Sequence, residues 1–266
     1  MKHILTGLTL WLVWPTVEAS LKPYLSDGAN LVYSSVSDVT WTADANLLGT
    51  LENKEGYTKV VNAIIAADPV IHDSANVKDT PSNSGRHTVT SSDFSSQYLG
   101  EVDWFGAQAF AAYLNSIDYG GSKQWRLPEV GANPQMDYQQ TGGELGQLYY
   151  SELNKLAYSP NPPYDFGILG NGTRGTSGAA GPFVNAQTWV YWYGDEYRST
   201  NNYCTAAECA WAFATQDGSQ NVESKAPYLN YAWVDSPGFW ALPLPSGFWL
   251  MLTGLLGLLG LKRRGA

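Results

Sequence analysis

Apolar and polar residues alternate near the start of the central part of the chain. Leu31 and Tyr33 lie on one side of a turn of Ser and Asp, and Val39 and Trp41 lie on the other. Alternation of period two on both sides of such a turn predicts a β-hairpin. A related signal returns in the last third, where "TWVYWYGDEY" is an aromatic run typical of a strand.

Two segments between these regions have helical spacing instead. Asp103 is placed to cap a first helix, and the pair Gly120-Gly121 ends it. One face of that helix would hold Trp104, Ala107, Phe110, Ala111 and Leu114. A second helix is predicted after Thr141, which fits a capping box with Glu144. Its apolar stripe would be Leu145, Leu148, Tyr149 and Leu153.

The pattern in the last third of the chain predicts antiparallel strands. "AWAFATQDGSQ" alternates Trp211 and Phe213 toward Asp217-Gly218, a hairpin turn, and a closing strand is predicted around Tyr231–Val234. A hairpin, two helices packed on it and several antiparallel strands together predict an α+β domain over residues 20–240.

Residues 52–100 carry no sustained period and are rich in Ser, Asn, Asp and Thr from His72 onward. This composition predicts a long insertion with a short helix near Tyr57–Ala67. His72 and His87 fall in the insertion, where we expect solvated loop histidines.

The N-terminus has the pattern of a secretory signal peptide. Lys2 and His3 precede an apolar run from Ile4 to Trp14, and Ala19 ends a stretch suited to signal peptidase. Residues 1–19 are therefore predicted to be a signal peptide that is removed on export.

The C-terminus ends in an apolar run and a basic stub. Gly247–Leu261 carries no charge, and Lys262, Arg263 and Arg264 follow at once. A helix over residues 246–261 would span about 24 Å at 1.5 Å per residue, less than the roughly 30 Å of a bilayer core. Two interpretations stay open from length alone, a marginal membrane anchor or a transient sorting tag. In either case the basic stub is expected to stay cytoplasmic.

The net charge of the chain excludes some classes of binding partner. The formal net charge is −9, and the two ends hold four of the 15 Lys and Arg and one of the 24 Asp and Glu. The remainder has 11 basic and 23 acidic residues, a charge of −12. Such a surface argues against nucleic acid as a partner, because phosphate binding depends on Lys and Arg. It argues equally against polyanionic sugars.

The sequence contains none of the common catalytic motifs. Nucleophile-elbow, phosphate-loop, zinc-protease and EF-hand patterns are absent from the sequence, so neither a cofactor nor a metal is predicted. Cys204 and Cys209 are the two cysteines, and in an exported chain such a close pair is expected to form a local disulfide.

Aromatic residues are the remaining candidates for ligand contact, since the chain has 11 Trp and 17 Tyr. Tyr side chains combine an apolar ring with a polar tip, which suits sugar rings and protein interfaces. The candidates near the cysteine pair are Tyr191, Tyr193, Tyr197 and Tyr203. Arg126 is the other candidate: Trp125 and Leu127 would face the core, leaving Arg126 to pair with Glu129 or Glu144, or to contact a ligand.

Several ordered motifs carry a family resemblance. "YGGSKQWRLPEV", followed by a helix beginning "GGELGQL", closely resembles the Lcl C-terminal domain family. "NLVYSSVSDVTWTADANL" resembles the opening hairpin of that family, while "YWYGDEY", "AWAFATQDGSQ" and "YAWVDSPG" resemble its later strands. The resemblance covers residues 29–50 and 102–238 and implies a C-type-lectin-like fold. "WVDSPG" keeps only Trp233 and Asp235 of the calcium-dependent lectin pattern, so such sugar binding is not implied.

The tail also resembles a known class. "LPLPSGFW" and the following apolar run resemble the V-P-L-P-A variant of PEP-CTERM sorting signals, with Leu242 for Val and Ser246 for Ala. The motif residues are Leu242, Pro243, Leu244, Pro245 and Ser246. The resemblance implies an exosortase as processing partner, alongside signal peptidase, and a passage through the inner membrane to the cell surface or beyond.

These observations predict an exported, non-catalytic binding protein whose ligand is a polysaccharide or a surface protein. Two alternatives stay open: a secreted hydrolase with an unrecognised acidic pair, and a purely structural matrix protein.

Overall fold

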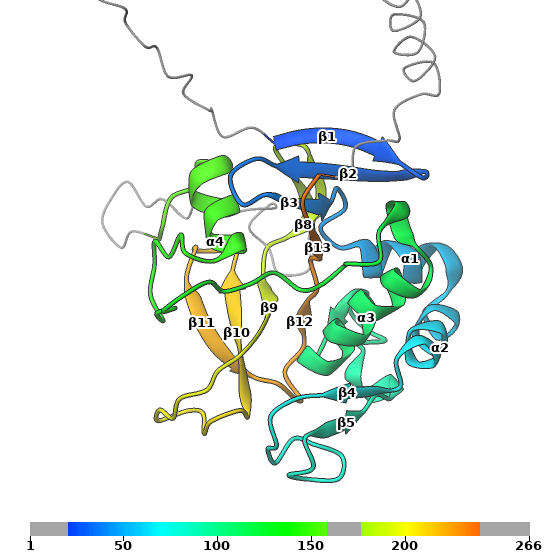
Figure 1. Cartoon of the computed structure of the whole chain (residues 1–266), viewed down its shortest axis with the longest axis vertical. Helices are drawn as coiled ribbons and strands as arrows, with labels where there is room; N and C mark the ends of the chain where they lie inside the picture. The colour runs from blue at the N-terminus through cyan, green and yellow to red at the C-terminus, as the bar shows by residue number, and fades with distance from the viewer. Residues whose placement is uncertain (1–20, 159–176, 240–266) are drawn as a thin grey trace, which may run out of the picture.

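The computed structural model describes residues 21–158 and 177–239 (Figure 1). The predicted signal peptide, sorting motif, apolar run and basic stub lie outside these ranges. Within them, no helix has both the length and the apolar character needed to cross a membrane. The described part is a mixed α+β fold, as the sequence predicts.

The N-terminal hairpin forms as predicted and belongs to a four-stranded antiparallel sheet. Val32 lies opposite Trp41, and Leu31 lies opposite Thr42. The strand order is β1-β2-β3-β13. Its members are β1 (Leu21–Ser26), β2 (Ala29–Ser34), β3 (Val39–Thr42) and β13 (Asp235–Pro237).

A five-stranded sheet, in the order β11-β10-β9-β12-β6, holds the aromatic strands. Its members are β11 (Gln220–Ser224), β10 (Cys209–Ala214), β9 (Val190–Glu196), β12 (Asn230–Tyr231) and β6 (Glu101–Val102). The closing strand predicted around Tyr231–Val234 is instead two short strands in different sheets. The buried residues between β12 and β13 serve two cores, since Val234 packs in one and Trp233 in the other.

The helices follow the sequence signals in part. They are α1 (Leu47–Glu55), α2 (Tyr57–Ala67), α3 (Trp104–Ser116) and α4 (Glu144–Gln147). The predicted helix at residues 57–67 and the face of α3 are confirmed, and Asp103 caps α3 by accepting from the Gly106 N–H at 2.9 Å. The predicted capping box of Thr141 does not form. Gly143 stands at the N-cap position of α4 instead, and the Glu144 carboxylate accepts two hydrogen bonds from the Arg126 guanidinium.

The region predicted to be a long insertion, residues 52–100, contains the end of α1, the predicted helix α2 and a short hairpin of β4 (Val70–His72) and β5 (Arg86–Thr88). His72 is exposed, but the prediction that His87 is solvated was wrong. The His87 ring is buried and stacks on Phe105 of α3, with ring centroids 3.8 Å apart. Polar neighbours in sequence concealed this contact, because it depends on where β5 meets α3.

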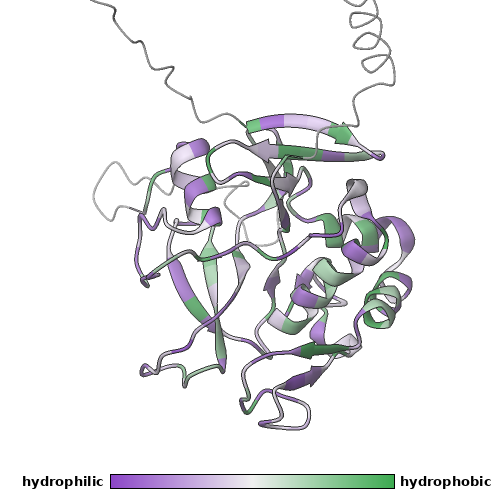
Figure 2. Cartoon of the chain, viewed as in Figure 1, coloured by the Kyte–Doolittle hydropathy of each residue, from purple (hydrophilic) through white to green (hydrophobic). Residues whose placement is uncertain are grey.

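Two hydrophobic cores lie on the two sides of β9. Trp192 packs in one core with Phe105 and Leu114, while Tyr191 and Tyr193 pack in the other. Figure 2 shows hydrophobic residues gathered on α2 and along β10. A short hairpin of β7 (Ser177–Ala180) and β8 (Phe183–Gln187) lies beside the second core, into which Phe183 packs. The central strand is therefore covered on both faces.

Glu52 of α1 makes the stability of the fold depend on pH. Its side chain is buried, Oε2 accepts from the Gly100 N–H at 2.7 Å, and Oε1 has no hydrogen-bond partner within the described residues. Burial raises the pKa of Glu52 from 4.5 to about 7. The folded state therefore holds a proton that the unfolded state releases, and stability is lost as pH rises from about 4.5 through 7.

Glu52→Gln keeps the acceptor for Gly100 and removes the titration. We expect this variant to exceed the parent in free energy of unfolding at pH 8, by up to about 3 kcal/mol, and to match it near pH 4.5. Urea unfolding at both pH values measures the difference. Glu55→Gln, at an exposed position of the same helix, is the matched control and should change little. An equal effect of Glu52→Gln at both pH values would contradict the assignment.

Candidate functional site

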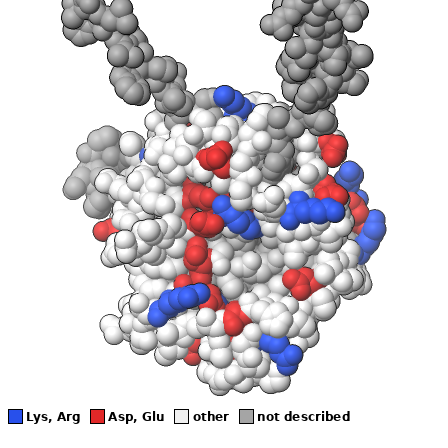
Figure 3. Space-filling view, viewed as in Figure 1, with Lys and Arg blue, Asp and Glu red and all other residues white. Residues whose placement is uncertain are grey.

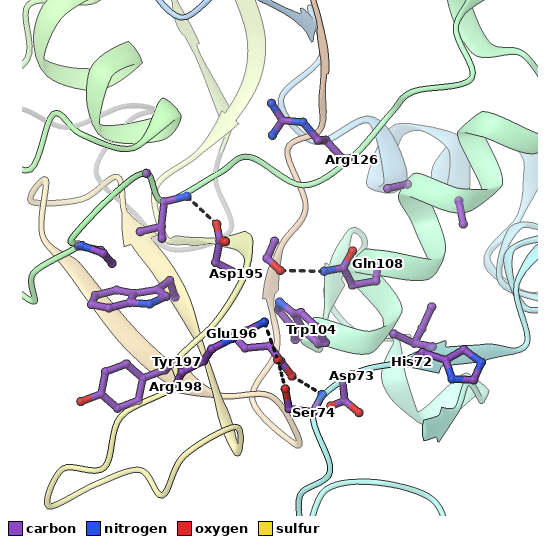
Figure 4. A pocket seen from close by; sticks show the side chains of 18 of the residues that line it. His72, Asp73, Ser74, Trp104, Gln108, Arg126, Asp195, Glu196, Tyr197 and Arg198 are labelled. Carbon is purple, nitrogen blue, oxygen red and sulfur yellow. Dashed lines mark hydrogen bonds and ion pairs between the residues drawn. The ribbon is translucent and has the colours of Figure 1, made fainter. Parts of the chain in front are cut away.

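A cleft of about 1500 Å³ lies between α3 and the C-terminal end of β9 (Figure 4). One face of α3 forms the first wall, because its lining residues recur at helical spacing: Trp104, Gln108, Ala111, Ala112 and Asn115. The opposite wall is residues 194–199 together with Trp211 of β10. Residues 125–136 close one end, and residues 68–74 close the other.

Amide side chains hold the α3 wall in place. The Gln108 Nε2 donates to the Gly194 carbonyl at 3.2 Å, and the Asn115 side chain bonds both the N–H and the carbonyl of Trp125. Gly194 lies close to the W-R-L-P segment, since a Cβ there would be 3.3 Å from the Leu127 carbonyl oxygen. These contacts bring the W-R-L-P segment, α3 and β9 together and set the width of the cleft.

Asp195 places a carboxylate in the cleft wall. Its Oδ2 accepts from the Val130 N–H at 2.7 Å (Figure 4), while Oδ1 makes no hydrogen bond within the described part of the chain. One oxygen thus fixes the orientation of the side chain. The other is left to accept a hydrogen bond from a ligand.

Arg126 is bound mainly by carboxylates of the protein itself. Its guanidinium makes two hydrogen bonds to Glu144, at 2.7 and 2.8 Å, and lies 3.3 Å from Asp235 and 3.7 Å from Glu129. The predicted pairing with Glu129 or Glu144 is therefore confirmed. Burial, followed by the nearby charge of Glu144, raises the pKa of Asp235 well above its usual range.

A buried lysine lies at the other end of the cleft. The Lys225 Nζ donates to Asp73 and to Glu196, at 2.6 Å each, and lies 4.6 Å from the centre of the Trp104 ring. Ser74 donates its N–H and hydroxyl to the same Glu196 (Figure 4). Burial would raise the pKa of Glu196, but the bonds from Lys225 and Ser74 lower it overall. This cluster ties residues 73–74 to β9.

The predicted ligand-binding tyrosines separate into three environments. Tyr191 and Tyr193 have no exposed surface, so their prediction as ligand contacts is corrected: both faces of β9 are covered and both hydroxyls bond inside the protein. Tyr197 is 8% exposed, lines the cleft and packs edge-on against Trp211. Tyr203 is 92% exposed and lies outside the cleft lining. It adjoins the Cys204–Cys209 disulfide, which is present as predicted.

Several cleft residues were missed from sequence. Asp195 and Glu196 could have been found, since two adjacent acids end an otherwise aromatic strand. Gln108 could have been read from its position on the α3 face that carries Ala111 and Ala112. The sequence around Lys225 does not indicate a role in the cleft, because its partners Asp73 and Glu196 lie far away in sequence.

His87, Asp93 and Asp103 form a buried cluster whose ligand atoms lie within 4.8 Å of one another. Each is engaged by the protein: His87 contacts the Lys78 carbonyl and Asp93, both at 3.2 Å, and Asp103 caps α3. Burial, with the neighbouring Asp93 charge, raises the pKa of Asp103 well above its usual range.

Acidic side chains form a row on the face that contains the cleft (Figure 3). Figure 3 shows Asp and Glu in a row along the middle of this face, with single basic side chains beside them. The cleft lining holds four carboxylates, Asp68, Asp73, Asp195 and Glu196, against the two arginines Arg126 and Arg198, and this excess disfavours anionic ligands.

Comparisons with family models, with curated proteins and with solved structures found no match to this chain. The structure therefore defines an α+β protein with an open, polar and acidic cleft. Any function has to be argued from that site.

Proposed function

We propose that the chain is an exported, non-catalytic binding protein whose cleft holds a neutral polysaccharide. The observation that carries the proposal is the cleft itself: it is open, one wall carries the fixed carboxylate of Asp195, and the α3 wall carries the side-chain amide of Gln108. Sugar hydroxyls donate to carboxylates and both donate to and accept from amides. Tyr197 and Trp211 add aromatic surface to the lining of the cleft. The acidic row disfavours polyanions such as heparin.

Asp195→Asn is expected to weaken retention of the polysaccharide by about tenfold or more, because a hydrogen bond to a charged acceptor contributes roughly 1.5–3 kcal/mol. Asparagine keeps an oxygen for the Val130 N–H, so the fold should be preserved. Affinity electrophoresis of the full chain in dextran and in galactomannan gives the dissociation constants, with heparin as the polyanion. Asp118→Asn, at an exposed acid outside the cleft lining, is the matched control. Binding that prefers heparin, or that ignores Asp195→Asn, would contradict the proposal.

The route to the surface and the finer fold assignment are part of the same proposal. The resemblance to the Lcl C-terminal domain family supports a C-type-lectin-like architecture, and the PEP-CTERM-like tail supports sorting by an exosortase.

Protein released from the envelope is then expected to lack the residues after about 243–246. Intact mass spectrometry of the released form measures its C-terminus, and a mass that includes residues 247–266 would contradict sorting by cleavage.

A further inference from the structure

A second cavity, of about 530 Å³, lies apart from the cleft and shares none of its lining residues. We call it the amide cavity. It is bounded by the first turns of α1, by residues 97–99, by two residues of β8 and by Tyr231. Its volume falls within the range typical of small-molecule sites.

The lining of the amide cavity is uncharged. None of its ten residues is ionised at neutral pH, and five carry a carboxamide: Asn46, Asn53, Gln97, Asn185 and Gln187. A carboxamide offers a donor and an acceptor side by side. A charged ligand would lose hydration here without gaining an opposite charge, whereas adjacent hydroxyls of a neutral polyol would find matching groups.

Hydrogen bonds hold two of these amides in fixed orientations. The Asn185 Nδ2 donates to Asp44 at 2.9 Å and to Thr50 at 3.2 Å, and the Gln187 Nε2 donates to the Asn185 carbonyl at 2.8 Å. With their NH₂ groups engaged, the side-chain oxygens of both residues become fixed acceptors. A fixed acceptor loses little entropy when a ligand binds.

Two further lining residues are exposed. Asn53 is exposed on α1, and its carboxamide makes no hydrogen bond within the part of the chain that the structure describes. Tyr98 lines the cavity with 48% of its surface exposed, so its ring can pack against the apolar face of a sugar. Fixed acceptors, a free amide and an exposed ring are the groups that a sugar unit requires.

We infer that the amide cavity is a second binding site, which takes a neutral saccharide unit through Asn53, Asn185, Gln187 and Tyr98. The inference does not depend on the cleft, because the two sites share no residue. A chain with two such sites could hold a polymer at two points, which raises apparent affinity through effective concentration.

Saturation-transfer NMR and calorimetry on the full chain test the inference with maltotriose, cellotriose and mannotriose as neutral probes. A uronic-acid trisaccharide serves as the charged comparison. We expect saturable binding of at least one neutral probe, with Asn53→Ala and Tyr98→Ala each raising its dissociation constant by about fivefold to tenfold. Tyr228→Ala, at another exposed tyrosine outside both cavities, should leave the constant unchanged.

The cleft variant separates the two proposals. Asp195→Asn should leave trisaccharide binding in the amide cavity intact, even where it abolishes polysaccharide retention by the cleft. The inference is overturned if none of the three neutral probes binds, or if the uronic-acid probe binds more tightly. It is also overturned if Asp195→Asn removes the binding while Asn53→Ala and Tyr98→Ala do not.

Discussion

Arg126→Ala is expected to lower the free energy of unfolding at pH 7 by about 3 kcal/mol. The guanidinium is the one cation within 4.0 Å of Glu144 and Asp235 in the described part of the chain, and its side chain is 26% exposed. Its removal leaves carboxylates with a buried negative charge and no counter-ion. Remaining exposure to water keeps the loss at the lower end of the range for buried pairs.

The loss should shrink in acid, which distinguishes it from a packing defect. Burial raises the pKa of Asp235 well above its usual range, so acid removes the negative charge of Asp235 and the cluster then needs its cation less. Arg126→Ala should therefore cost much less at pH 4 than at pH 7. Chemical denaturation at the two pH values measures this, with Glu144→Gln added to Arg126→Ala as the rescue variant. Lys123→Ala removes an exposed cation paired with Asp118 and is the matched control. A loss that is equal at both pH values would show that the Arg126 stem, and not its charge, supplies the stability.

Local signals in the sequence were sufficient for most of the elements. The hairpin at Leu31 and Trp41, the cap at Asp103 and the helix at residues 57–67 each depend on neighbours within a few positions. The W-R-L-P segment behaved likewise: Trp125 and Leu127 are buried, and Arg126 lies on the other side with Glu144. Such features are local, so a single sequence can show them.

The errors concern contacts between distant segments. Tyr191 and Tyr193 alternate as a strand with one exposed face would, but a second core covers that face. His87 lies among polar residues in sequence and becomes buried only because β5 packs on α3. Burial of this kind depends on tertiary packing, which the pattern of one segment does not contain.

The same limit applies to the candidate site. The pairing of Arg126 was predictable because Glu129 and Glu144 lie within the same motif region. Asp73, Glu196 and Lys225 come from three separate segments, and only the folded chain brings the Lys225 Nζ within 2.6 Å of both carboxylates. The amide cavity likewise combines α1, β8 and residues 97–99.

Lys225→Met is expected to have the largest effect, a loss of about 3–5 kcal/mol, because it removes the cation from a buried cluster and leaves two carboxylates facing each other. The Lys225 and Asp73 side chains have no exposed surface, and that of Glu196 is 9% exposed. Methionine fills most of the lysine volume and keeps contact with Trp104, so the change isolates the charge. Lys59→Met, at a cation with 71% of its side chain exposed, is the matched control.

Repulsion between Asp73 and Glu196 should also release the segment that lies at this end of the cleft. Amide hydrogen exchange is expected to accelerate first at Ser74, whose N–H donates to Glu196 at 2.8 Å, while α3 keeps its protection. Adding Asp73→Asn and Glu196→Gln to Lys225→Met removes the uncompensated charges, and this triple variant should recover most of the lost stability. If the triple variant stays as unstable as Lys225→Met alone, the packing of the lysine stem, and not its charge, joins residues 73–74 to β9.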